Sequence, residues 1–540
     1  MAERGIGIVA RFVAVLVAAV CLAGQSSLPQ RAWITILSTT DLHGNILPVD
    51  YYTDRPDARG LAKVASLVRQ IRGENPSGTL LLNSGDTIQG APLAYVHNTR
   101  NNAPPDPMML TMSAIGVDAM AVGNHEYNFG LGVLEKARSE ATFPWLSANT
   151  YNTGTGQPHY APYIVKEMQG VRVGILGLTT PGVPSWDDPK NYAGLQFREP
   201  LAEASKWVAR LRTEERADLV VIAMHMGLEE DLATGAAFPG QVLNENQALA
   251  IARHVEGVDV IVMGHTHREV PALVVNSTLL TQASAWGRHL ARADVYLERD
   301  GSQRWRVASK QARTIPVTDS TPIDAEIAKL AEPYDRETRT FLNRVIGQSD
   351  VELTVESFRD RDTALLDLVH RVQLEAGKAD VSMVAVFNQN ARVPKGDVRV
   401  RDLAGLYVYD NTLVVLDLTG RQLKDALEHS ARYFDGGIPD FNYDQAEGVS
   451  YELDTRKPVG QRVQNLRFRG KPVGATQTLR LATNNYRVNG GGGYTMYRGA
   501  PEVHRSSKEI RELVIEWVEE HKNIPAEPTN NWRMVSKPKS

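Results

Sequence analysis

Short polar motifs that contain aspartate and histidine follow apolar runs in the first half of the sequence. Asp41-Leu42-His43 follows one such run, and Gly264-His265-Thr266-His267 follows another much later in the chain. Because side chains alternate between the two faces of an extended chain, a spacing of two residues predicts that both members of each pair point to one side. Imidazole and carboxylate groups held together in this way are typical ligands of divalent metal ions.

Three further motifs place metal-type residues just after apolar runs. They are Asn83-Ser84-Gly85-Asp86, Gly123-Asn124-His125-Glu126 and Met224-His225. Taken alone, each could be structural, because a single histidine at a strand end is more often a hydrogen-bonded residue than a ligand. Five of the 13 histidines lie in these five motifs, and so many coincidences favour one shared site.

The motifs require elements that bring them together, and short apolar runs of mostly β-branched residues or leucine predict buried strands. The carboxyl ends of strands in an open α/β sheet form one crevice, so we expect the motifs to meet there. The predicted strands are Trp33–Ser38, Thr79–Leu82, Ala119–Val122, Val171–Leu178, Leu219–Met224 and Val258–Met263.

Segments between these runs have apolar residues at three- and four-residue spacing, which is typical of helices packed on a sheet. They are Leu61–Arg72, Leu131–Ser139 and Leu201–Arg212. Strands alternating with such helices predict an α/β layered domain over residues 33–320.

A second, smaller α/β domain is expected over residues 346–536, after a helical connector at 321–345. Ile323–Val345 is charged and helical in pattern despite Pro333. The second domain is predicted to contain helices at Thr363–Glu375, Arg421–Tyr433 and Lys508–His521, and strands at Thr412–Leu418 and Gln477–Ala482.

The N-terminus has the pattern of a secretory signal peptide, which we place at residues 1–27. Arg4 and Arg11 precede the apolar run Phe12–Ala23, and small or polar residues follow it. This run is short against the roughly 20 residues of a membrane-spanning helix, although an uncleaved anchor is the alternative. We therefore expect export to the periplasm or the cell exterior. Cys21, the one cysteine, would be lost with the signal.

The overall charge excludes binding by a large basic surface. The 540 residues include 59 Lys and Arg against 63 Asp and Glu, a formal charge of −4. Such a chain has no bulk field to hold a nucleic acid polymer or an anionic membrane. An anionic substrate must therefore be bound locally, by metal ions or a few placed side chains.

The wording of the motifs, TTDLHGN, NSGDTIQG, AVGNHEYNFG, AMHMG and VMGHTH, resembles the calcineurin-like metallophosphoesterases and specifically the secreted 5'-nucleotidase family. The resemblance implies a layered α/β/β/α domain with two divalent metal ions. Zn, Mn, Fe and Co remain open as their identity. It implies that Asp86 bridges the two ions, with Asp41, His43 and His267 completing one site and Asn124, His225 and His265 completing the other.

His125 is not needed as a ligand if Asn124 is one, so it is the candidate acid. In phosphoester hydrolysis two metal ions generate a hydroxide nucleophile, while a nearby imidazole stabilises the transition state or protonates the leaving oxygen. The family motif usually reads GNHEFD, but this chain has Asn128 in GNHEYN. An amide oxygen can fix the ring tautomer, but it cannot favour imidazolium by its charge.

The second domain carries aromatic residues suited to a nucleotide base. LYVYDNTL, ATNNYRVNGGGGY and NNWR resemble the bifunctional 2',3'-cyclic-nucleotide 2'-phosphodiesterase/3'-nucleotidases, which implies that Tyr409 and Tyr486 stack the base. Two core tyrosines are the alternative. Asn390 and Arg392 are candidate phosphate or ribose contacts. Gly490–Gly493 is interpreted as a turn that lets the backbone approach the ligand.

Together these features predict a secreted, metal-dependent hydrolase of nucleotides, with no membrane span in the mature chain. It would convert 2',3'-cyclic nucleotides to 3'-nucleotides, and 3'-nucleotides to nucleoside and phosphate. A 5'-nucleotidase with the same machinery is the main alternative. A non-catalytic nucleotide-binding protein and a relative acting on sulfur compounds are two others, disfavoured by the intact ligand set and by the paired tyrosines. Oligomeric state is left open.

Overall fold

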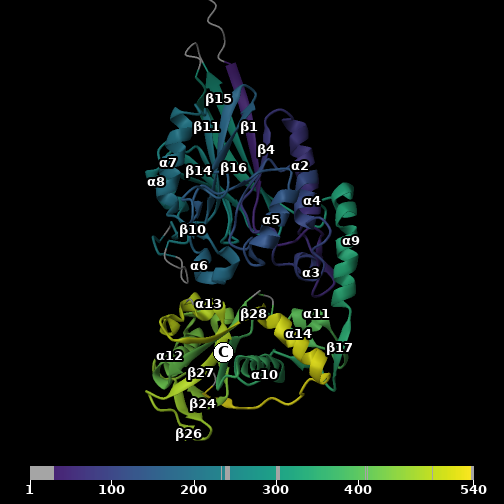
Figure 1. The fold of residues 1–540 in the computed structure, drawn as a ribbon, viewed down its shortest axis with the longest axis vertical. Helices are drawn as coiled ribbons and strands as arrows, with labels where there is room; N and C mark the ends of the chain where they lie inside the picture. The colour runs from purple at the N-terminus through teal and green to yellow at the C-terminus, as the bar shows by residue number, and fades with distance from the viewer. Residues whose placement is uncertain are drawn as a thin grey trace, which may run out of the picture.

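The computed structural model of the protein describes residues 30–536, except 233, 238–243, 300–303, 408, 410 and 489. The predicted signal segment and Cys21 lie outside the described residues. The chain folds into two α/β parts, and helix α9 (Ala325–Leu342) runs along the side of the first part towards the second (Figure 1). Among the helices of the described ranges, none has both the length and the apolar character needed to cross a bilayer.

The first domain is built on two six-stranded sheets. One has the order β16-β15-β1-β4-β5-β6 and the other the order β13-β14-β12-β11-β9-β8. The first sheet comprises β1 (Gln30–Thr39), β4 (Thr79–Asn83), β5 (Ala119–Ala121), β6 (Trp145–Leu146), β15 (His289–Arg299) and β16 (Arg306–Pro316). The second comprises β8 (Tyr163–Met168), β9 (Val171–Thr179), β11 (Leu219–His225), β12 (Val260–Met263), β13 (Glu269–Val275) and β14 (Thr278–Ala283).

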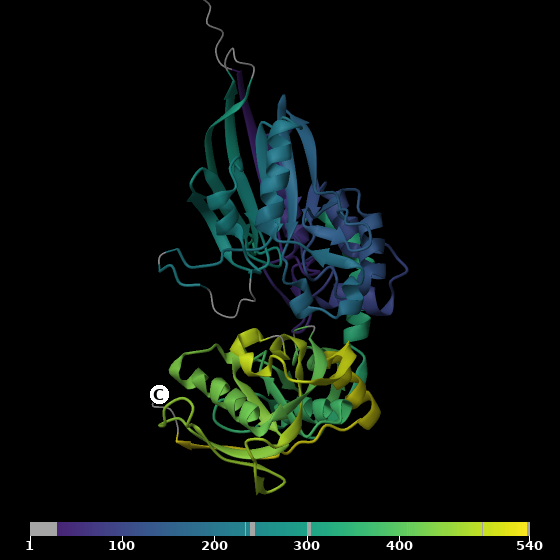
Figure 2. The same cartoon turned by 60° about the vertical axis from the view of Figure 1, so that its left-hand side comes forward.

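The strands that carry the motifs run parallel to one another within each sheet. β1 pairs in parallel with β4 and β4 with β5, while β11 pairs in parallel with both β9 and β12. Their carboxyl ends therefore meet at one end of the domain, which faces the second domain in both views (Figure 1, Figure 2).

Apolar residues of the two sheets pack face to face, which explains why the predicted strands are almost continuously hydrophobic. Ile34 and Leu82 of one sheet share a fully buried core with Val221 of the other. The outer faces are covered by helices, α2 (Leu61–Glu74), α4 (Pro107–Ala114) and α5 (Gly130–Glu140) on one side and α7 (Pro200–Thr213) and α8 (Ala248–His254) on the other. The predicted α/β/β/α layering is confirmed.

The second domain has a five-stranded mixed sheet of order β23-β19-β27-β22-β28. Helices α10 (Ala364–Gly377) and α14 (Ile510–His521) cover one face, and α12 (Gly420–Ser430) covers the other. The strands are β19 (Val381–Ala385), β22 (Thr412–Thr419), β23 (Asp444–Glu447), β27 (Thr478–Asn484) and β28 (Glu502–Glu509). A four-stranded sheet packs beside α12, and its order is β26 (Lys471–Pro472), β25 (Val463–Phe468), β24 (Val449–Asp454) and β29 (Trp532–Ser536).

Two predicted helices of this domain differ at their ends. The helix expected over Arg421–Tyr433 leaves the α conformation at Ser430 and continues as the 3₁₀ turn Ala431–Asp435. The helix expected from Lys508 begins at Ile510, because Lys508 and Glu509 still belong to β28. Glu509 has extended backbone and forms a capping box with Glu512, and such a cap ends the strand and starts the helix in one step.

Candidate metal centre

The loops after β1, β4, β5, β11 and β12 bring all seven predicted ligands to one end of the first domain. Two sets of side chains have ligand atoms within 4.8 Å of one another. The first set is Asp41, His43 and His267, and the second is Asp86, His225 and His265. Asn124, the seventh residue, lies with its Oδ1 atom 3.0 Å from His225 Nε2.

The backbone aims these side chains in a different way from the one the sequence suggested. β1 ends at Thr39, and Asp41 and His43 follow with φ values of 48° and 46°. Strand alternation therefore does not orient them. Sharp left-handed turns do, and such conformations are costly for residues with a Cβ and cluster at functional sites.

The same correction applies to the last motif. His265 and His267 have φ values of 71° and 56° and fall into different sets, so the expectation that they present two imidazoles together was wrong. The backbone turns sharply at both residues, so the His267 ring joins the first set and the His265 ring joins the second.

In the first set, lone pairs face one another. His43 Nδ1 lies 3.1 Å from both the carbonyl oxygen and the side-chain oxygen of Gln89, so Nδ1 carries the hydrogen. His43 Nε2 then points its lone pair at His267 Nε2, 3.0 Å away, and Asp41 Oδ1 is 3.4 Å from the same His267 atom. Burial lowers the pKa of His43 to about 4, although the charge of Asp86 acts in the opposite direction. The ring is therefore neutral, and its Nε2 lone pair is available to a metal ion. A histidine that binds a metal ion through one ring nitrogen typically donates a hydrogen bond from the other, as His43 Nδ1 does here.

The second set has the same character. His225 Nδ1 donates to the carbonyl oxygen of Ser84 at 2.7 Å, and its Nε2 lies 3.0 Å from Asp86 Oδ2. Burial would lower the pKa of His225, but the charge and hydrogen bond of Asp86 raise it to about 9. A positive charge is therefore favoured between these acceptors, and either a proton or a metal ion can provide it. The donor set of imidazole, carboxylate and amide oxygens fits divalent transition metals.

Asp86 is the carboxylate that connects the two sets. Its Oδ2 is 3.0 Å from His225 Nε2 and 3.8 Å from His43 Nε2, and its Oδ1 accepts from the backbone N–H of His125 at 2.9 Å. It lies between the sets, as expected of a bridging ligand.

Glu126 is a buried residue that the sequence did not single out beyond its motif. Its carboxylate accepts from the backbone N–H groups of Gly123 at 2.7 Å, Asp86 at 2.9 Å and Thr87 at 2.6 Å. The loop after β4 is thereby tied to the loop after β5. Both oxygens are used in this way, so Glu126 is a scaffold rather than a ligand.

His125 stands beside the centre and belongs to neither set. Its ring centroid is 5.2 Å from that of His43, and its Nδ1 lies 2.6 Å from Asn128 Oδ1. Asn128 Nδ2 in turn donates to Asp187 Oδ2 at 3.1 Å. Asp187 was not foreseen, because no motif in the sequence marks it.

In the second domain, Tyr409 is 47% exposed and packs edge-on against Phe387 at 5.2 Å. Tyr486 is partly buried, and its hydroxyl accepts from the backbone N–H of Gly492 at 3.0 Å. Burial, and to a smaller extent the charge of Tyr486, raises the pKa of Tyr409.

The glycine turn approaches Tyr486 itself. Gly490, Gly492 and Gly493 have positive φ, and a Cβ on Gly491 would lie 2.5 Å from the Tyr486 ring. The absence of side chains therefore lets this turn pack on the tyrosine.

Asn390 and Arg392 are exposed, and the described contacts join neither of them to the two tyrosines. The Arg392 side chain is 62% exposed and lies 3.5 Å from Glu352. Phe387, from the same tract, is the residue that reaches Tyr409.

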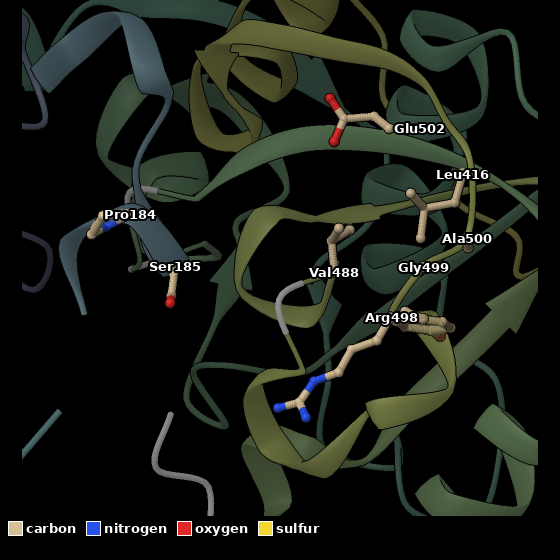
Figure 3. Close-up of a pocket in the computed structure, with 9 residues that line it drawn as sticks. Pro184, Ser185, Leu416, Val488, Arg498, Gly499, Ala500 and Glu502 are labelled. Carbon is tan, nitrogen blue, oxygen red and sulfur yellow. The ribbon is translucent and has the colours of Figure 1, made fainter. Parts of the chain in front are cut away.

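The two domains meet at helix α6 (Val183–Trp186). The side chain of Asn485, next to Tyr486, donates to the carbonyl oxygen of Trp186 at 2.7 Å, and the Trp186 ring lies 5.2 Å from that of His265. A cavity of about 360 Å³ lies beside this contact, with Pro184 and Ser185 on one side and Val488, Arg498 and Glu502 on the other (Figure 3). The base-side and metal-side residues are thus linked through one short segment.

Two protein families match the chain. Residues 34–269 match the calcineurin-like phosphoesterases, and residues 345–499 match the 5'-nucleotidase C-terminal domain. The matches fall on the two domains described above. The phosphoesterase fold implies divalent metal ions, in agreement with the two sets of donors.

Relatives of similar architecture are nucleotide phosphoesterases. The chain is 28% identical to a 2',3'-cyclic-nucleotide 2'-phosphodiesterase/3'-nucleotidase of Yersinia enterocolitica, over 93% of this chain and 88% of that protein. It is 29% identical to a 5'-nucleotidase of Vibrio vulnificus, over 93% and 94%. The trifunctional nucleotide phosphoesterase protein YfkN of Bacillus subtilis is 28% identical over 95% of this chain, which spans only 39% of that relative.

A crystal structure from Staphylococcus aureus, described as a candidate 5'-nucleotidase in complex with alpha-ketoglutarate, is similar over 93% of this chain and all of that one. The TM-score is 0.81 at 27% identity. The protein therefore carries a calcineurin-like phosphoesterase domain followed by a 5'-nucleotidase C-terminal domain, and the phosphoesterase domain makes it a hydrolase.

Proposed function

We propose that this hydrolase cleaves phosphate esters of nucleotides with the help of two divalent metal ions. The proposal rests above all on the facing acceptor atoms around Asp86, which bound cations would satisfy. Asp41, His43 and His267 would hold one ion, Asn124, His225 and His265 would hold the other, and Asp86 would contact both. When bound, such ions activate water and offset the charge of the phosphoryl group.

His125 is the residue we assign to the chemistry of the leaving group. Asn128 Oδ1 holds its Nδ1, so Nε2 is left for the substrate. From there an imidazolium donates a proton to the leaving oxygen or stabilises the charge that develops in the transition state.

The second domain would hold the nucleoside. Tyr409 is half-exposed and Tyr486 is partly buried, so both rings suit stacking on a base, which tolerates any base because each has a π-face. Asn390 and Arg392 are exposed and would contact the ribose or phosphate. Arg392 would first have to break its ion pair with Glu352. We assign residues 33–320 to catalysis, 321–345 to the connector and 346–536 to base binding.

The substrates we favour are 2',3'-cyclic nucleotides and 3'-nucleotides. This choice is supported by Asn128 in GNHEYN, by the tyrosine motifs and by the relative from Yersinia enterocolitica. Hydrolysis of 5'-nucleotides is the second candidate, because relatives such as the one from Vibrio vulnificus carry that name. The N-terminal segment supports export from the cytoplasm.

The test compares three substrates with one enzyme preparation. Purified protein is treated with a chelator, reloaded with Mn²⁺ or Co²⁺, and assayed on 2',3'-cyclic AMP, 3'-AMP and 5'-AMP. We expect activity only after reloading, and mainly on the first two. Preference for 5'-AMP would replace our assignment with the second candidate, and no activity on any of the three would reject a nucleotide hydrolase.

A further inference from the structure

We propose that Asp187 is a positioning residue for His125 and acts through Asn128. The GNHEYN motif has an amide where the family motif has a carboxylate. Asp187 provides a carboxylate on the far side of that amide, hydrogen-bonded to Asn128 and not to His125 itself. This inference deepens the proposed function, because it concerns the same catalytic histidine.

The three side chains form a continuous hydrogen-bonded chain. His125 Nδ1 lies 2.6 Å from Asn128 Oδ1, and Asn128 Nδ2 lies 3.1 Å from Asp187 Oδ2. Asp187 Oδ1 accepts from Asn191 Nδ2 at 2.7 Å and from the backbone N–H of Asp188 at 2.7 Å. Each of these three partners donates a hydrogen bond to Asp187.

This arrangement decides which way the Asn128 amide faces. A carboxylate only accepts hydrogen bonds, so the NH₂ group of Asn128 must turn to Asp187, and its oxygen must turn to His125. An oxygen at Nδ1 requires the ring hydrogen to be on Nδ1. Nε2, on the side of the metal centre, is then the nitrogen that exchanges a proton with the substrate.

Without Asp187 nothing in these contacts would hold the amide in this direction. Asn128 could turn over and present its NH₂ group to Nδ1, which would favour the tautomer with its hydrogen on Nε2. With the amide NH₂ group on the Nδ1 lone pair, the ring cannot become the imidazolium that donates a proton to the leaving oxygen. The effect is one of orientation, and it reaches His125 only through Asn128.

The position of Asp187 gives this link a further consequence. Asp187 directly follows Trp186, whose carbonyl oxygen accepts from Asn485 of the second domain. The segment that contacts the base-binding domain therefore also orients the catalytic histidine.

The first test is a double-mutant cycle on p-nitrophenyl phosphate and bis(p-nitrophenyl) phosphate, which need no nucleotide recognition. We expect Asp187→Ala to lower kcat about 10-fold, as removal of an outer partner typically does, with KM and metal content unchanged. In a His125→Ala background the same change should have no further effect. An equal loss in both backgrounds would mean that Asp187 only supports the fold. Asp188→Asn is the matched control, since its side chain contacts Lys190 instead.

The second test exchanges the two groups. Asn128→Asp alone places two carboxylates against each other and should lower kcat, whereas Asn128→Asp combined with Asp187→Asn restores an amide and carboxylate pair. We expect kcat of the double variant to exceed that of Asn128→Asp. A double variant no better than Asn128→Asp would overturn the proposal.

A third measurement does not depend on activity. In full-length Zn²⁺-loaded protein with isotope-labelled histidine, NMR should find His125 with its hydrogen on Nδ1, and Asp187→Ala should shift it towards the other tautomer. An unchanged tautomer rejects the role of Asp187. If the wild type cleaves no phosphoester but the tautomer shifts, the proposed function fails and this inference stands.

Discussion

Among single residues, we expect Asp86 and His125 to have clearly separate roles. Asp86 is buried between the two ligand sets, with Nε2 of His225 and of His43 on either side of its Oδ2. His125 contacts the centre only through its backbone N–H and the edge of its ring. Metal binding and acid chemistry should therefore respond to different substitutions.

Replacing Asp86 with Ala should reduce bound metal from about two ions per chain to fewer than one, because both sites lose a charged ligand. His267→Ala, which touches only the first set, should retain about one ion. Elemental analysis of the purified proteins measures this. A fully active wild type with one ion per chain would contradict the two-ion assignment.

His125→Ala should lower kcat by roughly 10²–10⁴ while metal content stays the same, since a positioned acid contributes about that factor. Steady-state kinetics beside elemental analysis decides between the two roles. Loss of metal in this variant would make His125 a ligand and would move Asn124 out of the set.

At the scale of elements, buried carboxylates hold loops and helix ends together. Glu126 joins the loops after β4 and β5 through three backbone N–H groups. Asp367 on α10 accepts from the backbone N–H of Thr529, which precedes β29, and so ties the end of the chain to the second domain. We therefore expect Glu126 to affect thermal stability and metal retention, and Asp367 to affect the pH dependence of stability.

Glu126→Gln should lower the melting temperature and weaken metal retention, because an amide offers one acceptor oxygen where two are used. Hydrogen bonds to a charged group are worth about 1.5–3 kcal/mol each, so a loss of roughly that size is expected. Glu135→Gln on α5 is the control, since its partially exposed ion pair with Arg138 should contribute less than about 1 kcal/mol. Equal effects of the two changes would show that Glu126 is not a special link.

Asp367 predicts a pH dependence of stability. Burial and the neighbouring Asp362 and Glu447 raise its pKa to about 7, from an ordinary value of 3.8. The folded state thus holds a proton that the unfolded state releases, so this group favours folding fully below about pH 4 and loses that effect as pH rises to 7.

Asp367→Asn should therefore stabilise the protein at pH 8, stabilise it less as the pH falls, and have little effect at about pH 4. The gain should not exceed about 4 kcal/mol, because each pKa unit corresponds to about 1.4 kcal/mol. Thermal unfolding of both proteins across this range, without divalent ions, measures it. A constant difference in melting temperature would rule out the titration of Asp367 as the cause.

For the whole molecule, the main consequence of the fold is that the predicted metal ligands and the predicted base-stacking rings lie in different domains. They meet where Asn485 contacts Trp186, beside the cavity of about 360 Å³. Substrates that engage both domains should depend on both, while small substrates should depend on the first alone.

Tyr409→Ala and Tyr486→Ala should each reduce kcat/KM for nucleotides by about 10- to 100-fold, because stacking contributes roughly 1–3 kcal/mol per base. Hydrolysis of bis(p-nitrophenyl) phosphate should change little. Tyr409→Phe and Tyr486→Phe keep the ring and serve as controls. Equal losses on both kinds of substrate would identify the tyrosines as structural residues.

Local sequence was sufficient for the layers and for the set of candidate ligands. Apolar runs such as Leu219–Met224 specify buried strands wherever they lie, and polar residues directly after them must lie at the sheet edge. The strands of the first domain and the convergence of the motifs followed from that reasoning. The ends of α12 and α14 did not, because caps and 3₁₀ turns depend on a few local contacts.

The directions of side chains and the contacts between distant residues depend on the tertiary structure. Left-handed turns at Asp41 and His267 orient these ligands, and no periodicity in the sequence encodes a φ value, so the grouping was implied by the family resemblance and not by residue spacing. Asp187 meets Asn128, and Phe387 meets Tyr409, only because the chain folds them together. The sequence by itself determined which side chains are available for the chemistry, since residue type and strand ends are local properties. The packing of sheets and loops decided which of them touch, because contacts between distant residues arise only when the whole domain has closed around them.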